Sequence, residues 1–424
     1  MNISIKKYIK ITFYMYFSLI LFAPISVGAP FILNYTRVFH VPLFYFPIML
    51  LSILIFLKKG GRPDLIFYLL ILFPLVSLFN FSHVDDLFQW IPYILMSFVN
   101  AFIYLVIKDI NVSDTYFFIK KYIHWVVAIV LIGPVFFLIG WATDWINVYS
   151  RLGVNRNAIA FIYWSAFTFQ FIITAYKGSF KNIALSLILL LAIIFTFSRT
   201  IYMLTMIVIM LFFYSGDQTM VFKYCKKGIE KLKFNKLKMF LSIVITLFAF
   251  SLLFGEFILP RLIQFLDATM VYNFSNEIGI HANDGRRQLL LIGSLSVFFD
   301  NLLLGVGAGQ SWLNLPSYVT DVSGSGDAHN AYVRVLAENG LIGFFILSSA
   351  FYLLIKRKIK LRRFSKFKPH YDLNLVSIAS LFIIIAIPFY ALGSSYLITN
   401  PFVWLMISLS ATDKSVFCQN SRVS

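Results

Sequence analysis

The sequence predicts an all-α polytopic membrane protein with about twelve transmembrane helices. Of its 424 residues, 60% are hydrophobic and only 13% are charged. Apolar runs of roughly 17 to 25 residues recur along the chain, and a helix of that length crosses a hydrocarbon core ~30 Å thick. Because lipid offers the backbone no hydrogen bonds, so many apolar segments can cross it only as helices.

Twelve spans follow from the lengths of the apolar runs and the charges between them. They cover roughly 11–30, 38–57, 64–80, 87–107, 122–141, 157–176, 182–197, 200–214, 238–256, 335–355, 373–391 and 396–411. The chain thus divides into helices one to nine (1–256), a large outer loop (257–334), helices ten to twelve (335–411) and a tail (412–424). We expect the first span to be retained, since it is longer than a signal-peptide core and lacks a convincing cleavage site.

The positive charges fix the predicted orientation. With both termini in the cytoplasm, 28 of the 36 Lys and Arg residues face the cytoplasm and eight face outward, as the positive-inside rule requires. The formal net charge of +18 therefore reports topology and not nucleic-acid binding. All eight outer residues are arginine, whose planar guanidinium binds phosphate through two hydrogen bonds. They are Arg37, Arg151, Arg156, Arg199, Arg261, Arg286, Arg287 and Arg334.

The stretch IIFTFSRTIYML (193–204) places Arg199 within 33 residues that carry no other charge after Lys181. As one helix, 182–214 would be ~50 Å long, too long for one crossing. A single crossing would also put the lysine-rich 215–238 segment outside. We therefore predict two short helices with an outer turn at Ser198-Arg199-Thr200. Such a turn spares Arg199 the ~2.5–3.5 kcal/mol cost of a bilayer centre and places it in an outward funnel.

The large loop contains one further apolar piece, LLLIGSLSVFF (289–299), which is too short to span. We expect an amphipathic or interfacial helix there. Glycine-rich turns at LGVGAGQ (304–310) and SGSGD (323–327) favour an ordered outer element with mobile parts. Both cysteines, Cys225 and Cys418, fall on the cytoplasmic side, so no disulfide is implied.

The segment DAHNAYVRVLAENGLIG (327–343) is the strongest candidate for chemistry. It predicts about two helical turns that meet Gly340 before the tenth span. Asp327 or Asn330 could cap this helix. His329 would then stand at the membrane entrance, where a neutral imidazole can accept a hydroxyl proton. The alternative is that His329 is merely a solvated neighbour of the cap.

The other outer arginines allow more than one role. Arg286 and Arg287 point about 100° apart on a helix, so at most one of them aims at the funnel. The alternative to a site role for each is a solvated charge at a helix start. Arg156 opens the sixth span either as an anchor or as a ligand-binding residue. Arg334 and Glu338 are four residues apart, which favours a helix ion pair over a site. We find no metal-ligand spacing, no phosphate-binding loop and no Asp-x-Asp pair.

Three motif pieces in order resemble the bacterial O-antigen polymerase and O-antigen ligase superfamily. They are Ser198-Arg199, then Arg287 seventeen residues before the Gly305-Val306-Gly307 turn, then His329-Asn330 followed by Glu338, Gly340 and Gly343. The similarity covers roughly residues 150–355. Family members often carry a tryptophan four residues after the loop arginine, whereas this chain has Leu291, so the choice of Arg287 over Arg286 depends on the spacing to the glycine turn.

The resemblance implies a glycosyltransferase that needs no metal, nucleotide or other cofactor. Its donor would be a glycan on undecaprenyl pyrophosphate, in the bacterial cytoplasmic membrane with the active site facing the periplasm. Arg199 and Arg287 would stabilise the pyrophosphate and His329 would take the acceptor proton. Arg286, Arg156, Asn330 and Asp327 would help bind the substrates.

Two acceptors are compatible with this machinery. A polymerase would extend another lipid-linked repeat unit and could have a chain-length regulator as a partner. A ligase would transfer the glycan to the lipid A core. We favour the polymerase because of the HNxYxxxLxENGLIG form. A flippase for the same lipid is a less favoured alternative, since the spans show no internal repeat and little mid-membrane charge. A noncatalytic scaffold would make the arginines mere anchors.

Overall fold

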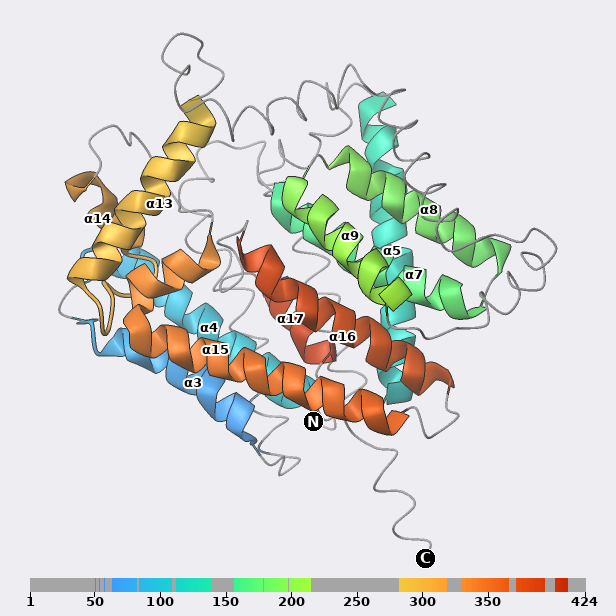
Figure 1. Ribbon diagram of the computed structural model, residues 1–424, viewed down its shortest axis with the longest axis horizontal. Helices are drawn as coiled ribbons and strands as arrows, with labels where there is room; N and C mark the ends of the chain where they lie inside the picture. The colour runs from blue at the N-terminus through green and yellow to red at the C-terminus, as the bar shows by residue number, and fades with distance from the viewer. Residues whose placement is uncertain are drawn as a thin grey trace, which may run out of the picture.

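The fold is seen in a computed structural model (Figure 1) that describes 63–81, 84–108, 112–138, 156–177, 179–196, 198–214, 282–318, 330–365, 371–392 and 401–410, with Leu50, Ile53 and Leu57. All regular structure in these ranges is helical, which confirms the predicted all-α class for them. The helices are α3 (Leu65–Leu78), α4 (Leu87–Ile107), α5 (Val112–Leu138), α7 (Arg156–Lys177), α8 (Phe180–Phe195), α9 (Arg199–Tyr214), α13 (Ala282–Asp300), α14 (Ser311–Asn314), α15 (Ala331–Ser365), α16 (Tyr371–Leu392) and α17 (Pro401–Ser410), with a 3₁₀ turn η3 (Leu315–Ser317).

Nine of the predicted spans fall on described helices, and α4 has the predicted bounds. The predicted spans at 11–30 and 238–256, and most of 38–57, lie outside the described residues. Two helices differ by ten residues at one end: α15 ends at Ser365 and not at 355, and α5 begins ten residues before the predicted 122. Lys120 and Lys121 marked the predicted boundary, but their ammonium groups lie 4.4 and 5.8 Å from the ring centroids of Tyr116 and Phe117. Their stems therefore cover helical surface instead of ending the helix.

Length and composition single out two described helices that could cross a membrane. They are Ala331–Lys360 within α15 and Leu375–Leu392 within α16. Shorter apolar stretches of 10–17 residues lie in α3, α4, α7, α8, α9 and α13. The described part of the chain is thus an all-helical protein with candidate membrane helices, and the number of crossings stays a prediction.

Helix α16 lies at the centre of the packing. It contacts α15 on one side and α5, α7, α9 and α17 on others, while α3 and α4 pack in turn on α15 and α17 (Figure 1). Every residue from Leu375 to Ile384 is buried. One continuous hydrophobic core therefore joins α3–α5, α7–α9 and α15–α17.

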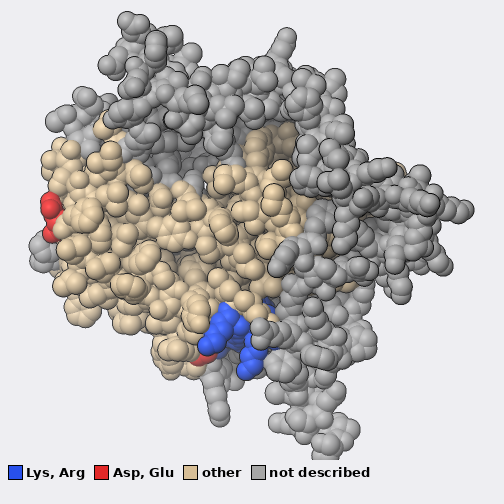
Figure 2. Space-filling model, viewed as in Figure 1, with Lys and Arg blue, Asp and Glu red and all other residues tan. Residues whose placement is uncertain are grey.

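Outside this core the molecule exposes apolar side chains. Met203, Met206 and Met210 follow one face of α9 at helical spacing and are exposed. Figure 2 shows a broad face on which the described side chains are uncharged, with Lys and Arg gathered at its lower edge. Such a face suits lipid better than water.

Charged residues tie three helices together at one end of the bundle. Asp64 caps α3 and accepts a hydrogen bond from the Phe67 amide at 3.0 Å. Its carboxylate lies 3.3 Å from Lys108 Nζ, just after α4, and 2.8 Å from Arg357 Nη1 on α15. These positions are the predicted cytoplasmic ends of their helices. The opposite end of the same three helices carries the candidate site.

Candidate functional site

Helix α15 is folded sharply at Gly340. This glycine has φ 61° and ψ −166°, which no helical residue adopts. In a straight helix Tyr332 and Phe344 would lie about 18 Å apart along the axis, but their ring centroids are 6.3 Å apart. The first segment of α15 (331–339) therefore folds back beside the second segment (341–365), at the glycine where we predicted the end of a short helix.

The loop after α13 pairs with the backbone at this fold. The amides of Val306 and Gly307 donate to the carbonyls of Ala337 and Glu338, each at 2.9 Å. In the other direction, the amides of Leu341 and Ile342 donate to the carbonyls of Leu302 and Leu303, at 2.8 and 3.2 Å. Backbone groups released by the broken helix are thus satisfied within the protein, which is the condition for non-helical backbone at membrane depth.

Two glycines make this approach possible. Gly305 has φ 72°, and a Cβ added there would lie 2.4 Å from the backbone carbon of Glu338. A Cβ on Gly340 would lie 2.3 Å from the backbone carbon and oxygen of Leu303. Each glycine touches the backbone of the other segment, so a side chain at either position would push the glycine loop (302–310) and α15 apart. The two glycine motifs of the sequence therefore form one structural unit.

Hydrogen bonds with the chain between α3 and α4 hold the glycine loop in place. The Asn80 amide nitrogen donates to the carbonyls of Leu304 and Gly305 at 2.7 and 2.6 Å. Gln310 makes a pair of hydrogen bonds with the backbone of Asp86, at 3.1 and 3.0 Å. On the other side of the fold, Asn339 Nδ2 donates to Ser77 Oγ at 2.5 Å. These hydrogen bonds fit the predicted ordered outer element, and the second glycine stretch, 323–327, lies outside the described residues.

Arg334 and Glu338 form the predicted helix ion pair, with Arg334 Nε 2.9 Å from Glu338 Oε1. Burial makes this pair more than a surface contact, because the side chains are only 6% and 3% exposed. Glu338 Oε1 also accepts a hydrogen bond from Ser311 Oγ at 2.9 Å. The Arg334 guanidinium lies 4.8 Å from the centroid of the Tyr93 ring. This buried cluster joins α4, α14 and the first segment of α15.

Asn330 is the cap of α15, one of the two caps that the sequence allowed. Its Oδ1 accepts hydrogen bonds from the amides of Tyr332 and Val333, at 3.0 and 3.3 Å. The predicted proton acceptor His329 directly precedes this cap in the chain. His329 and Asp327 lie outside the described residues.

The apolar run around Arg199 is divided into two helices, as predicted. Helix α8 ends at Phe195, and the Thr196 hydroxyl donates to the Ile193 carbonyl at 2.7 Å. The Ser198 carbonyl accepts from the Tyr202 amide at 3.0 Å, which starts α9. The Tyr202 hydroxyl also donates to the Ile194 carbonyl and ties the two helix ends together. Arg199 is therefore the first residue of α9.

The starts of α7, α9 and α15 share one end of the bundle. Phe161, in the second turn of α7, packs against Tyr390 near the end of α16, with the rings tilted by 43° and their centroids 4.6 Å apart. The Tyr332 hydroxyl at the start of α15 donates to the Pro388 carbonyl near the same end of α16, at 2.9 Å. Phe171 and Phe212, each in the second half of its helix, have ring centroids 5.0 Å apart, so α7 and α9 run in the same direction and start at the same end of the bundle. Two predicted site residues, Arg156 and Arg199, are thus the first residues of helices that begin at the end where Asn330 caps α15.

The predicted helix in the outer loop is α13, and it extends beyond the apolar piece. Leu290, Ser294 and Val297 form its buried stripe, at the spacing of an amphipathic helix. Its C-terminal half packs on α15 and on the glycine loop. Arg286 and Arg287 lie near its first turn, about 15–20 Å along the helix from that contact.

The C-terminal end of α13 is linked to the turn that follows α14. The hydroxyl of Tyr318 donates to the Asp300 carboxylate. This hydrogen bond, followed by burial, raises the pKa of Tyr318 above its ordinary value. Tyr318 therefore stays protonated at neutral pH and can keep donating to Asp300.

Sequence analysis missed the residues that hold this end together from α3 and α4. Asn80 contacts residues more than 220 positions away in the chain, and neither Tyr93 nor Ser311 stands in a recognisable motif. The glycines at 305, 307 and 340 were the signal available in the sequence. In the structure all three adopt positive φ values, which favour glycine. In the described ranges no group of three His, Cys, Asp or Glu side chains could hold a metal ion.

Comparison with protein families supports the predicted resemblance. Residues 184–348 match the family model described as O-antigen ligase. The match runs from α8 through the Ser198-Arg199 turn and the glycine loop to the fold of α15. It supports the O-antigen polymerase and ligase superfamily, and with it glycan transfer in surface polysaccharide biosynthesis in general. No curated protein matches the chain.

Proposed function

We propose that this protein is a polymerase that joins lipid-linked oligosaccharide repeat units on the outer face of the bacterial cytoplasmic membrane. The donor is a glycan on undecaprenyl pyrophosphate, and the acceptor is a sugar hydroxyl of a second lipid-linked repeat unit. The observation that carries the proposal is the shared end of α7, α9 and α15, where two arginines begin helices at the end at which Asn330 caps α15. The family match over 184–348 supports the same class of reaction.

In this mechanism the acceptor hydroxyl oxygen bonds to the anomeric carbon of the donor as that carbon loses its bond to the pyrophosphate oxygen. The electron pair leaves with the lipid pyrophosphate, and the hydroxyl proton passes to His329. Asp327 orients the imidazole. Negative charge grows on the pyrophosphate during the reaction, so cationic groups fixed in a water-poor pocket lower the barrier.

Arg199 and Arg287 stabilise that charge, with Arg156 and Arg286 as further contacts to pyrophosphate or glycan. An arginine at the first position of a helix has a second advantage, because the helix N-terminus is itself electropositive. Arg156 and Arg199 both occupy this position, at the start of α7 and α9. Asn330 caps α15 and thereby fixes the chain next to His329.

The test is a reaction of the purified full-length protein with lipid-linked repeat units alone. A ladder of products that grow by one repeat unit is the expected result. Product that forms only after lipid A core is added would make the protein a ligase. Absence of glycan transfer, together with movement of the lipid across a vesicle bilayer, would make it a flippase and refute the proposal.

A further inference from the structure

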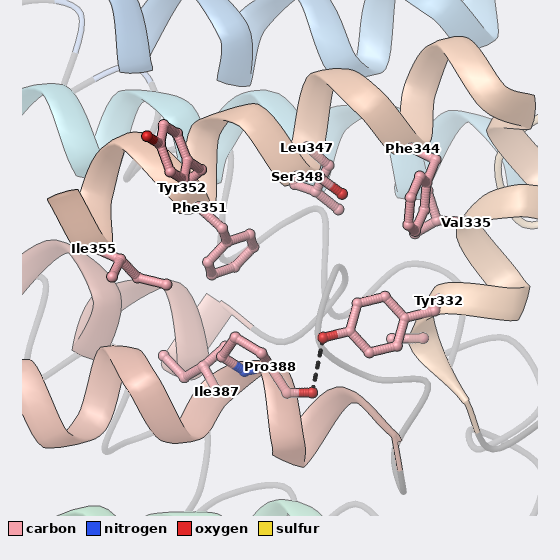
Figure 3. A pocket seen from close by; sticks show the side chains of 11 residues that line it. Tyr332, Val335, Phe344, Leu347, Ser348, Phe351, Tyr352, Ile355, Ile387 and Pro388 are labelled. Atoms are coloured by element: carbon pink, nitrogen blue, oxygen red, sulfur yellow. Dashed lines mark hydrogen bonds between the residues drawn. The ribbon is translucent and has the colours of Figure 1, made fainter.

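A narrow apolar groove runs between α15 and α16, and nothing in the mechanism above uses it. Its volume is about 260 Å³, and its lining is almost entirely aromatic or aliphatic. Figure 3 shows the second segment of α15 on one side and α16 on the other, with Phe344, Leu347, Phe351 and Ile355 along the wall. From Phe344 to Ile355 the groove follows α15 for about 17 Å, roughly half of the hydrocarbon thickness.

One end of the groove reaches the candidate site. Tyr332 and Val335, on the folded-back first segment of α15, close this end, and the Tyr332 hydroxyl is bonded there to the Pro388 carbonyl. Tyr332 lies two residues after the Asn330 cap and three after His329. The fold of α15 at Gly340 therefore closes this end of the groove, and the segment that closes it follows the proposed proton acceptor in the chain.

We propose that this groove binds the polyisoprenyl chain of the lipid-linked donor, an assignment that rests on the proposed function. A lining of this kind at membrane depth fits a hydrocarbon chain and offers nothing to a sugar or a pyrophosphate. Only one substrate carries its lipid next to the reacting carbon. In the donor, a single pyrophosphate separates the anomeric carbon from the chain, whereas the acceptor hydroxyl is separated from its own lipid by a repeat unit. A groove that ends at Tyr332, two residues after the Asn330 cap, is placed for the donor chain.

Two adjacent serines provide matched variants. Ser348 lines the groove, whereas Ser349 is exposed and does not line it. Ser348→Trp fills the groove, and Ser349→Trp adds the same side chain one position away. The probe is undecaprenyl pyrophosphate with a photoreactive diazirine on its isoprenoid chain, added to the protein in nanodiscs. We expect Ser348→Trp to lower labelling at least about tenfold, because the displacement of only about two CH₂ groups of the probe from the groove weakens binding by that factor. Ser349→Trp should label as the wild type does.

A second measurement avoids the risk that Ser348→Trp fails to fold. Mass spectrometry of the labelled wild-type protein should place the probe on the α15 peptide that contains Phe351 and on the α16 peptide that contains Pro388. Labels on other helices would overturn the assignment. Equal labelling by a diazirine phospholipid that undecaprenyl pyrophosphate does not displace would show a general lipid site, and would also overturn it. Labelling does not require glycan transfer, so a wild-type protein that labels in the groove but forms no product would refute the proposed function and leave the groove assignment standing.

Discussion

Removal of the Glu338 carboxylate should destabilise the protein far more than the loss of an ordinary helix ion pair. An exposed pair at this spacing contributes about 0.3–0.5 kcal/mol. Here both side chains are almost fully buried, and Arg334 cannot lose its proton. Loss of one partner of a buried pair typically costs ~3–5 kcal/mol, because the other charge stays buried. We therefore expect Glu338→Leu to lower the free energy of unfolding by about 3–5 kcal/mol. This range includes the cost of the hydrogen bond that the Ser311 hydroxyl loses.

The matched control is the double variant Arg334→Met, Glu338→Leu. Replacement of a whole buried pair by apolar side chains is often neutral or stabilising. Both variants leave the Ser311 hydroxyl without its Glu338 acceptor. The double variant also loses the contact of Arg334 with the Tyr93 ring, at 4.8 Å, and such a contact contributes ~0.5–2 kcal/mol. The double variant should therefore be about 2–3 kcal/mol more stable than Glu338→Leu.

The assay is an SDS unfolding titration of the purified protein in mixed micelles, followed by helical circular dichroism. If Glu338→Leu lowers the free energy of unfolding by less than about 1 kcal/mol, the pair contributes no more than an exposed ion pair does. That result would refute the reasoning from burial. A double variant as unstable as the single variant would also refute it, because the cost would then come from side-chain shape and not from an unpaired charge. Glycan transfer should fall in Glu338→Leu and recover in the double variant, since the cluster supports the first segment of α15.

Four further outcomes test the site. Arg199→Lys should lower turnover by about 10²-fold or more, because an ammonium cannot reproduce two parallel hydrogen bonds to pyrophosphate; full activity would exclude the pyrophosphate role. His329→Ala should lower transfer by about 10²–10⁴-fold at normal membrane abundance, and wild-type rates would remove the proposed proton acceptor. Gly340→Ala should cost at least about 1–2 kcal/mol in the same SDS titration, because its φ of 61° is strained for any side chain and the added Cβ would lie 2.3 Å from the Leu303 backbone; an unchanged titration midpoint would contradict this role. EDTA should leave the rate unchanged, and a rate restored only by Mg²⁺ would contradict a mechanism that relies on arginine.

Parts of the candidate site followed from sequence because they depend on local rules. Charge and length alone divided the run around Arg199, and α9 begins at that residue. The spacing of Arg334 and Glu338 predicted their ion pair. Burial of the pair did not follow, since it depends on Tyr93 and Ser311 from distant parts of the chain. The partners of the glycine loop did not follow for the same reason, because they are Asn80 and the backbone of α15.

By itself, the sequence determined the all-helical class, most helix positions and the resemblance to a family, because hydropathy, charge and motif spacing act over a few residues to one helix length. It also marked Gly340 as an interruption. Only the tertiary structure decided what the interruption does. The chain folds back there because the carbonyl and amide groups of 302–307 replace the missing helical partners, and these groups come from a different segment of the chain. That long-range pairing brings Tyr332 to α16 and closes one end of the apolar groove.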